Sequence, residues 1–121
     1  MAQPQQVTST LYPFLQIRIE VRDWRDEALA LLDTGFEGPL TIPVSMTQYA
    51  MGPPDTSANW ELADASVVEA PVYFGAVEII GLASIPDVAI TALGNEYILG
   101  REIQDLFEVT FDHGERVTAK P

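Results

Sequence analysis

Apolar and polar residues alternate along the first part of the chain. From Phe14 to Arg22 apolar side chains stand at every second position, with Gln, Arg and Glu between them, which predicts a strand with one buried face. A polar turn over 23–26 follows, and the unbroken apolar run over 28–32 is typical of a strand covered on both faces. That run ends at Asp33, so we expect a carboxylate where a buried strand stops.

Short strands separated by turn residues account for most of the remaining chain. The expected strands cover 40–42, 60–62, 66–74, 77–80, 82–85, 88–90, 97–99 and 109–111. A short helix should follow the capping box of Ser45 and Gln48 and end at Gly52, and one late helix should cover 102–108. This order predicts an all-β chain, a small barrel or sandwich with one short C-terminal helix.

A chain of 121 residues is long enough for one compact domain and too short for two, so we expect a single domain over 1–121. Residues 1–10 are polar and uncharged, and we expect them to form a flexible arm. They lack the basic and apolar regions of a signal peptide, and every long apolar stretch is interrupted by acidic residues. We therefore expect a cytoplasmic protein without a membrane partner.

Composition narrows the chemistry that the chain can carry. Eighteen acidic and six basic residues give a formal net charge of -12, which argues against nucleic acid as a partner. The absence of cysteine excludes disulfides, a thiolate nucleophile and a Cys-based zinc site. The single histidine, His113, excludes a Ser/His triad within one chain, and its place in an expected turn indicates an exposed, inert side chain. We expect neither a metal nor a cofactor.

Two short motifs stand out against this background. Asp33-Thr34-Gly35 follows two leucines, and Gly35 with the nearby Gly38 allows the backbone to turn sharply or approach another segment closely. Downstream, Ile98-Leu99-Gly100-Arg101 leads into the late helix. Taken alone, Asp-x-Gly is also ordinary turn chemistry, in which the carboxylate only caps a loop.

With these motifs the sequence resembles the retropepsin-like aspartic peptidases, in particular the small bacterial predicted aspartyl proteases. The resemblance rests on Leu31 to Gly35, on the flap-like segment Leu62 to Ser66, and on Ile98 to Arg101, in that order. It implies a closed acid-protease β-barrel. Because the chain holds one Asp-Thr-Gly, the resemblance also implies a homodimer in which two copies share one active site.

The resemblance assigns roles to individual residues. Asp33 would be the catalytic acid, Thr34 would link the two active-site loops across the dimer axis, and Gly35 would offer its backbone to the carboxylate and the substrate. Glu37, four places after Asp33, would pair with Arg101, which we expect to be partly buried. The flap tip would consist of Ala63, Asp64, Ala65 and Ser66, and the supporting segment of Ile98, Leu99, Gly100 and Arg101.

Several alternatives stay open at this level. Glu37 and Arg101 could form an ion pair at the site or be two independent surface residues, and the sequence favours neither interpretation. Trp60 and Tyr73 fit either a substrate groove or buried aromatic packing. The flap tip carries Asp64 and no glycine, unlike the glycine-rich retroviral flap, so flap closure should differ.

The resemblance implies an aspartic endopeptidase that cleaves extended peptides or proteins with a water molecule activated between two Asp33 carboxylates. A rival of another class is a non-catalytic dimeric module of the same fold that binds peptides or supports assembly. A third possibility is an enzyme that matures its own precursor, with residues 1–10 as a removable arm.

Overall fold

The computed structural model describes residues 5–48 and 51–121, which form ten strands, one 3-10 helix and one α-helix. The strands, in chain order, are β1 (Val7–Ser9), β2 (Phe14–Val21), β3 (Trp24–Leu32), β4 (Leu40–Ile42), β5 (Thr56–Glu61), β6 (Val67–Ile79), β7 (Ala83–Ala92), β8 (Ile98–Leu99), β9 (Glu108–Asp112) and β10 (Arg116–Lys120). The helices are η1 (Val44–Gln48) and α1 (Arg101–Gln104). None of the helices in this part of the chain is long and apolar enough to cross a membrane.

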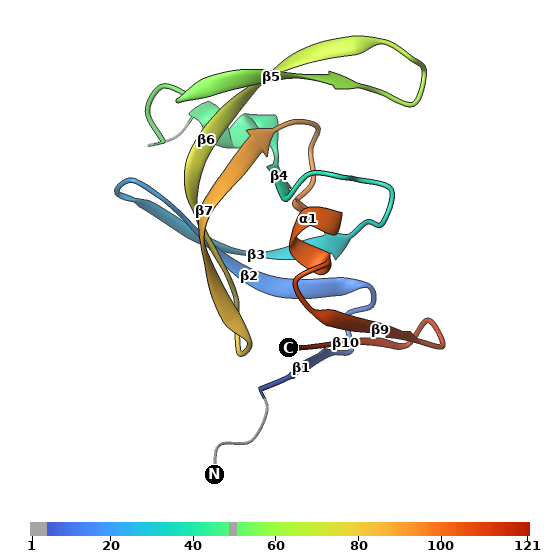
Figure 1. Ribbon diagram of the computed structural model, residues 1–121. Coiled ribbons are helices and arrows are strands. Elements are labelled where there is room, and N and C mark those ends of the chain that lie inside the picture. The colour runs from blue at the N-terminus through green and yellow to red at the C-terminus, as the bar shows by residue number, and fades with distance from the viewer. Residues whose placement is uncertain (1–4, 49–50) are drawn as a thin grey trace.

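Six of the strands close into a barrel. Their hydrogen-bonded order is β2-β3-β8-β4-β7-β6, and β6 pairs back with β2, from Ile17 opposite Ile79 to Glu20 opposite Ala76. β5 lies outside this ring and forms a hairpin with β6. Figure 1 shows the hairpin across the top of the barrel, with its tip on the same side as the loop between β3 and β4. The expectation of an all-β chain with a closed barrel is confirmed.

The alternating apolar residues of the strands fill the barrel. In β2 four of these side chains are at most 1% exposed, namely Leu15, Ile17, Ile19 and Val21. β3 differs from the expectation, since it begins at Trp24, directly after a two-residue turn, and Leu29 is 44% exposed. The prediction that 28–32 is covered on both faces is wrong, because the outer face of β3 points to solvent and only Ala30 and Leu32 of that run are buried.

β6 and β7 are each one long strand where the sequence pattern predicts two. The break expected in β6 is a register shift between Gly75 and Val77 in its pairing with β7. A Cβ atom on Gly75 would lie 2.2 Å from the carbonyl oxygen of Glu20, so only glycine lets β6 pass β2 this closely. In β7, Asp87 lies within the strand with a φ of +57°. Turn-forming residues therefore bend these strands without ending them.

A three-stranded sheet of order β1-β10-β9 joins the two ends of the described chain, with Val7 opposite Ala119. It lies below the barrel in Figure 1. Residues 7–9, which we expected in a flexible arm, are therefore strand β1, while residues 1–4 lie outside the described residues. The sequence pattern predicts neither β1 nor β10: β1 is short and its partner lies at the other end of the chain, and β10 forms a hairpin with β9 that the pattern over 116–120 does not indicate.

Of the two predicted helices, the late one is shorter than the sequence pattern predicts. η1 is a single 3-10 segment that begins at Val44, and residues 49 and 50 lie outside the described part of the chain. α1 ends at Gln104 because β9 already begins at Glu108. Turn hydrogen bonds, such as that from the Phe107 N–H to the Gln104 carbonyl oxygen at 3.0 Å, fill the interval.

Candidate active site

The Asp33 loop is held between the ends of two parallel strands. β3 and β8 pair with Leu31 opposite Ile98 and Leu32 opposite Leu99. One step further, the Asp33 N–H donates to the Leu99 carbonyl oxygen at 3.2 Å. The supporting segment from the second sequence motif therefore lies directly beside the first motif, and it fixes the backbone of Asp33.

Gly100 is the closest crossing point beneath this loop. Its N–H donates to the Pro39 carbonyl oxygen at 3.0 Å, and the Arg101 N–H donates to the Phe36 carbonyl oxygen at 2.8 Å. A Cβ atom on Gly100 would lie 1.9 Å from the Gly38 carbonyl oxygen and 2.7 Å from that of Phe36. Residues 33–39 can therefore fold over the start of α1 only because position 100 has no side chain.

The Asp33 carboxylate is held by the backbone of its own motif. The Gly35 N–H donates to Asp33 Oδ1 at 2.8 Å, and the Phe36 N–H donates to the Asp33 carbonyl oxygen at 3.3 Å. Asp33 is partly exposed, while Thr34 and Gly35 are exposed. The motif thus presents an oriented carboxylate and a threonine at the surface of a single chain.

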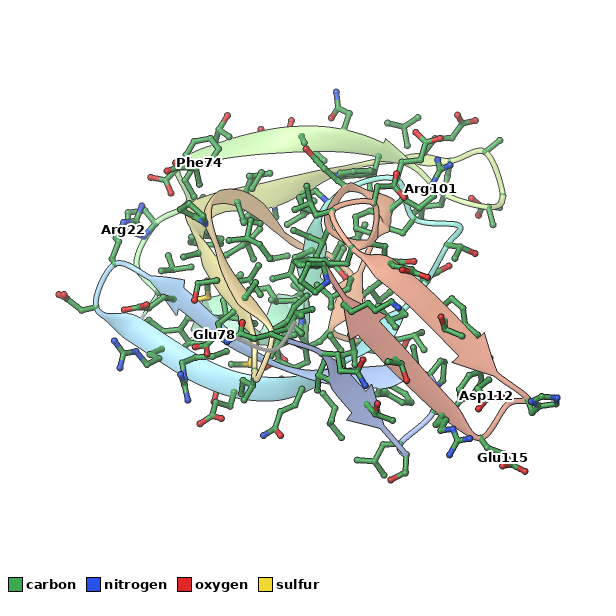
Figure 2. The ribbon with its side chains drawn as sticks, turned by 60° about the horizontal axis from the view of Figure 1, so that its bottom comes forward. Arg22, Phe74, Glu78, Arg101, Asp112 and Glu115 are labelled. Carbon is green, nitrogen blue, oxygen red and sulfur yellow. The ribbon has the colours of Figure 1, made fainter. Side chains whose placement is uncertain are left out.

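Glu37 and Arg101 form an ion pair across the loop, with 2.9 Å between Arg101 Nη2 and Glu37 Oε1. The expectation of a partly buried arginine is wrong, because the Arg101 side chain is 47% exposed and that of Glu37 is 81% exposed. In Figure 2 Arg101 lies on the side of the molecule opposite to Arg22. An exposed pair of this kind contributes about 0–1 kcal/mol to folding.

The turn of the β5–β6 hairpin, the predicted flap tip, is tight and uses alanine where glycine is usual. The Ala65 N–H donates to the Leu62 carbonyl oxygen at 2.9 Å, and Ala65 has a φ of +68°, in the left-handed region. The backbone N–H and the hydroxyl of Ser66 donate to Asp64 Oδ1 at 3.0 and 2.5 Å. These two donors, the hydroxyl first, lower the pKa of the Asp64 carboxyl. The side chain of Asp64 therefore stabilises the tip in place of glycine.

An aromatic contact joins the β5–β6 hairpin to the Asp33 loop. The rings of Trp60 in β5 and Phe36 lie 5.1 Å apart, centroid to centroid, at 46°. Gly38 makes room for both, since a Cβ atom there would lie 2.9 Å from Trp60 Cη2 and 2.7 Å from Phe36 Cζ. Trp60 Nε1 is buried without a hydrogen-bond partner in the described residues. Trp60 thus packs between the β5–β6 hairpin and the Asp33 loop, whereas Tyr73 belongs to the core, with 1% of its surface exposed.

Sequence reasoning missed Phe36, although an aromatic residue between the Asp-Thr-Gly motif and Gly38 is a usable signal.

A hollow of about 180 Å³ lies behind the loop, between α1 and β7, and Pro39, Val88 and Ile103 line it. It does not reach Asp33. No three His, Cys, Asp or Glu side chains in the described ranges are arranged to hold a metal ion. The prediction of an exposed His113 is confirmed, with 89% of its side chain exposed.

Comparisons with known proteins agree with this geometry at the level of the fold. No family model and no curated protein sequence matches the chain. Among solved structures, the chain is similar to a retropepsin-like aspartic protease from Rickettsia conorii, with a TM-score of 0.64 and 12% sequence identity. The match covers 99% of this chain and 96% of that one. The chain has the retropepsin-like fold. At 12% sequence identity this similarity shows the architecture alone.

Proposed function

We propose that this protein is an aspartic endopeptidase that acts as a homodimer. The observation that carries the proposal is the position of Asp33. Its backbone is tied to Leu99, its carboxylate accepts a hydrogen bond from the Gly35 N–H, and the group still faces solvent. An aspartate that served only as a turn cap would not need residues 33–39 to cross so closely over Gly100.

The dimer follows from the number of acids. One chain supplies one Asp33, and the chemistry needs two carboxylates that share a proton. A two-fold axis that passes beside the exposed Thr34 would bring two copies of the loop together. Thr34 would then link the two loops through hydrogen bonds across the axis.

In the proposed reaction the two carboxylates hold one proton between them. The ionised Asp33 takes a proton from a water molecule, which attacks the carbonyl carbon of the peptide, while the protonated Asp33 donates to the developing oxyanion. Collapse of the tetrahedral intermediate returns a hydroxyl proton to the ionised Asp33 and breaks the C–N bond, while the leaving amine takes the proton of the other Asp33. The dyad then again holds one proton. The reaction therefore needs no cofactor and forms no covalent acyl-enzyme.

The hairpin supplies the surface for the substrate. An extended peptide between hairpin and loop would pair with backbone groups and place apolar side chains against Phe36, Trp60 and Leu62. Leu62 beside the tip is 38% exposed, and the neighbouring Val67 is 65% exposed, so apolar surface is available there. Peptides or proteins in an extended conformation are thus the proposed substrate class.

The test is cleavage of a peptide library by the wild-type protein and by Asp33→Asn at several pH values. We expect the asparagine variant to fold and dimerise but to lose cleavage, because an amide can neither ionise nor share the proton. Asp105→Asn, at an exposed acid at the end of α1, is the matched control and should retain activity. Cleavage by Asp33→Asn at the wild-type rate would exclude the mechanism. Peptide binding without cleavage by the wild type would favour the non-catalytic module.

A further inference from the structure

The guanidinium of Arg22 joins two segments that are far apart in the sequence. Arg22 Nη1 donates to the Met51 carbonyl oxygen at 2.7 Å, and Arg22 Nη2 donates to Asp55 Oδ1 at 2.8 Å. Arg22 lies in the two-residue turn between β2 and β3, with a φ of +53°. Arginine rarely adopts this left-handed conformation, so the turn keeps a disfavoured residue whose side chain makes two contacts.

Asp55 continues the connection to β6. Its Oδ2 accepts a hydrogen bond from the Phe74 N–H at 2.9 Å, and its own N–H donates to the Val72 carbonyl oxygen at 2.9 Å. One carboxylate therefore holds the turn between β2 and β3 with one oxygen and a backbone amide of β6 with the other. The same backbone hydrogen bond, followed by the charge of Arg22, lowers the pKa of Asp55.

These contacts lie at the root of the flap hairpin. Asp55 directly precedes β5, and Phe74 directly precedes Gly75, where β6 shifts register and passes β2. Figure 2 shows Arg22 and Phe74 at one end of the hairpin and Arg101 near the other end. A small rotation at the root would therefore be enlarged at the tip and would alter the contact between Trp60 and Phe36.

We propose that Arg22 and Asp55 are positioning residues, here called the root latch, that fix the angle at which the flap hairpin lies over Asp33 and thereby set substrate affinity. This inference rests on the proposed function, because it needs a substrate that binds under the hairpin. The root latch does not touch Asp33. It acts through β5 and β6, so its loss should weaken substrate binding and leave the chemical step intact.

Two variants open the root latch with little damage to the fold. Arg22→Gly removes the guanidinium and suits a φ of +53° better than arginine does. Asp55→Asn removes the charge but keeps a side-chain oxygen that can accept from the Phe74 N–H. Glu78→Gln is the matched control, because the Arg18–Glu78 pair joins β2 to β6 at 2.7 Å with exposures of 37% and 34%, against 42% and 31% for Arg22 and Asp55.

The experiment measures peptide cleavage kinetics and amide hydrogen exchange on the same four proteins. For both root-latch variants we expect KM to rise about twofold to fivefold, the range that the loss of a partly exposed charged pair supports, with kcat unchanged within about twofold. Amides of β5 and of β6 up to Phe74 should exchange faster, whereas barrel amides should not. Glu78→Gln should match the wild type in KM and in hairpin exchange.

Two results would overturn the inference. One is a KM equal to that of Glu78→Gln in both root-latch variants, whatever their melting temperatures. The other is hairpin exchange that does not differ from the control. If the wild type cleaves no peptide, the proposed function fails first, and exchange alone then decides whether the root latch holds the hairpin: faster exchange confined to β5 and the outer part of β6 supports that part, and unchanged exchange rejects it.

Discussion

Gly100 lies so close to Gly38 that a Cβ atom on Gly100 would stand 1.9 Å from the Gly38 carbonyl oxygen. Position 100 therefore requires glycine because of the backbone that crosses above it, and not because of its own φ. The acid-bearing loop and the start of α1 cannot separate without losing the hydrogen bonds from the N–H groups of Gly100 and Arg101.

Gly100→Ala should therefore lower the free energy of unfolding by about 3 kcal/mol or more, because backbone atoms of the loop must move. Gly114→Ala is the control, since Gly114 has a φ of +70° but open space around it. That control should lose only about 1 kcal/mol from backbone strain. Urea unfolding of both variants measures the difference, and equal losses would contradict the close crossing.

Ala65→Gly should raise stability, because Ala65 has a φ of +68° in the turn of the β5–β6 hairpin. Relief of the left-handed strain outweighs the extra freedom of glycine in the unfolded chain by about 0.5–1 kcal/mol. Ala63→Gly, at a position without a positive φ, should instead lower stability. The two variants are compared by urea unfolding, and destabilisation by Ala65→Gly would show that its φ is not strained.

Arg101→Ala should cost about 1 kcal/mol or less, because its pair with Glu37 is exposed. Arg116→Ala is the comparison, since Arg116 Nε lies 2.7 Å from Asp112 Oδ2 with its side chain 56% exposed. Both variants should unfold at nearly the same urea concentration at low protein concentration. A much larger loss for Arg101→Ala would mean that assembly buries the Glu37 pair.

Stability should fall in acid, in part through Asp64. Donors from Ser66 lower the pKa of this carboxyl in the folded chain below its ordinary 3.8, so the group adds stability above pH 3.8 that is lost as pH falls through the folded pKa. Asp64→Asn should therefore flatten the fall in melting temperature below pH 3.8 and lower stability at neutral pH. An unchanged pH profile would exclude a role for this carboxylate.

Cleavage should depend on protein concentration, salt and mild acid. Each chain has a formal charge of -12, so two chains repel each other at neutral pH. Added salt and a pH lowered toward about 4 reduce that repulsion, which should favour the dimer and turnover together. Light scattering beside a cleavage assay over a dilution series measures both. Undiminished specific activity in a monomeric population would contradict a shared site.

Local patterns in the sequence predicted the parts of the fold that depend on neighbouring residues. The alternation from Phe14 gave β2, and the two motifs around Asp33 and Gly100 marked the strand ends that lie side by side. The local sequence pattern did not predict the ends of strands that are determined by the strand they pair with. Gly75 suggests a strand end, but β6 continues through it because β7 is paired on both sides of the shift.

The remaining features of the candidate site depend on contacts between distant segments. No local pattern around Phe36 or Trp60 predicts that the two rings are in contact. The contact forms only when the hairpin folds over the loop. Likewise, Arg22 and Asp55 stand in two separate turn regions, and only the barrel brings them within 2.8 Å. Such pairs cannot be predicted from the periodicity of either segment.

The pairing of β1 with β10 bears on the order of events in folding. Val7 can meet Ala119 only after nearly the whole chain is available, so this sheet is the slowest kind of contact to form. A circular permutant that begins at Gly114, ends at His113 and joins Pro121 to Met1 would turn the same two strands into a local hairpin. Its native ladder would be unchanged and its β1–β10 pairing would form early, while the β9–β10 pairing, now between the two ends of the permuted chain, would become the late one.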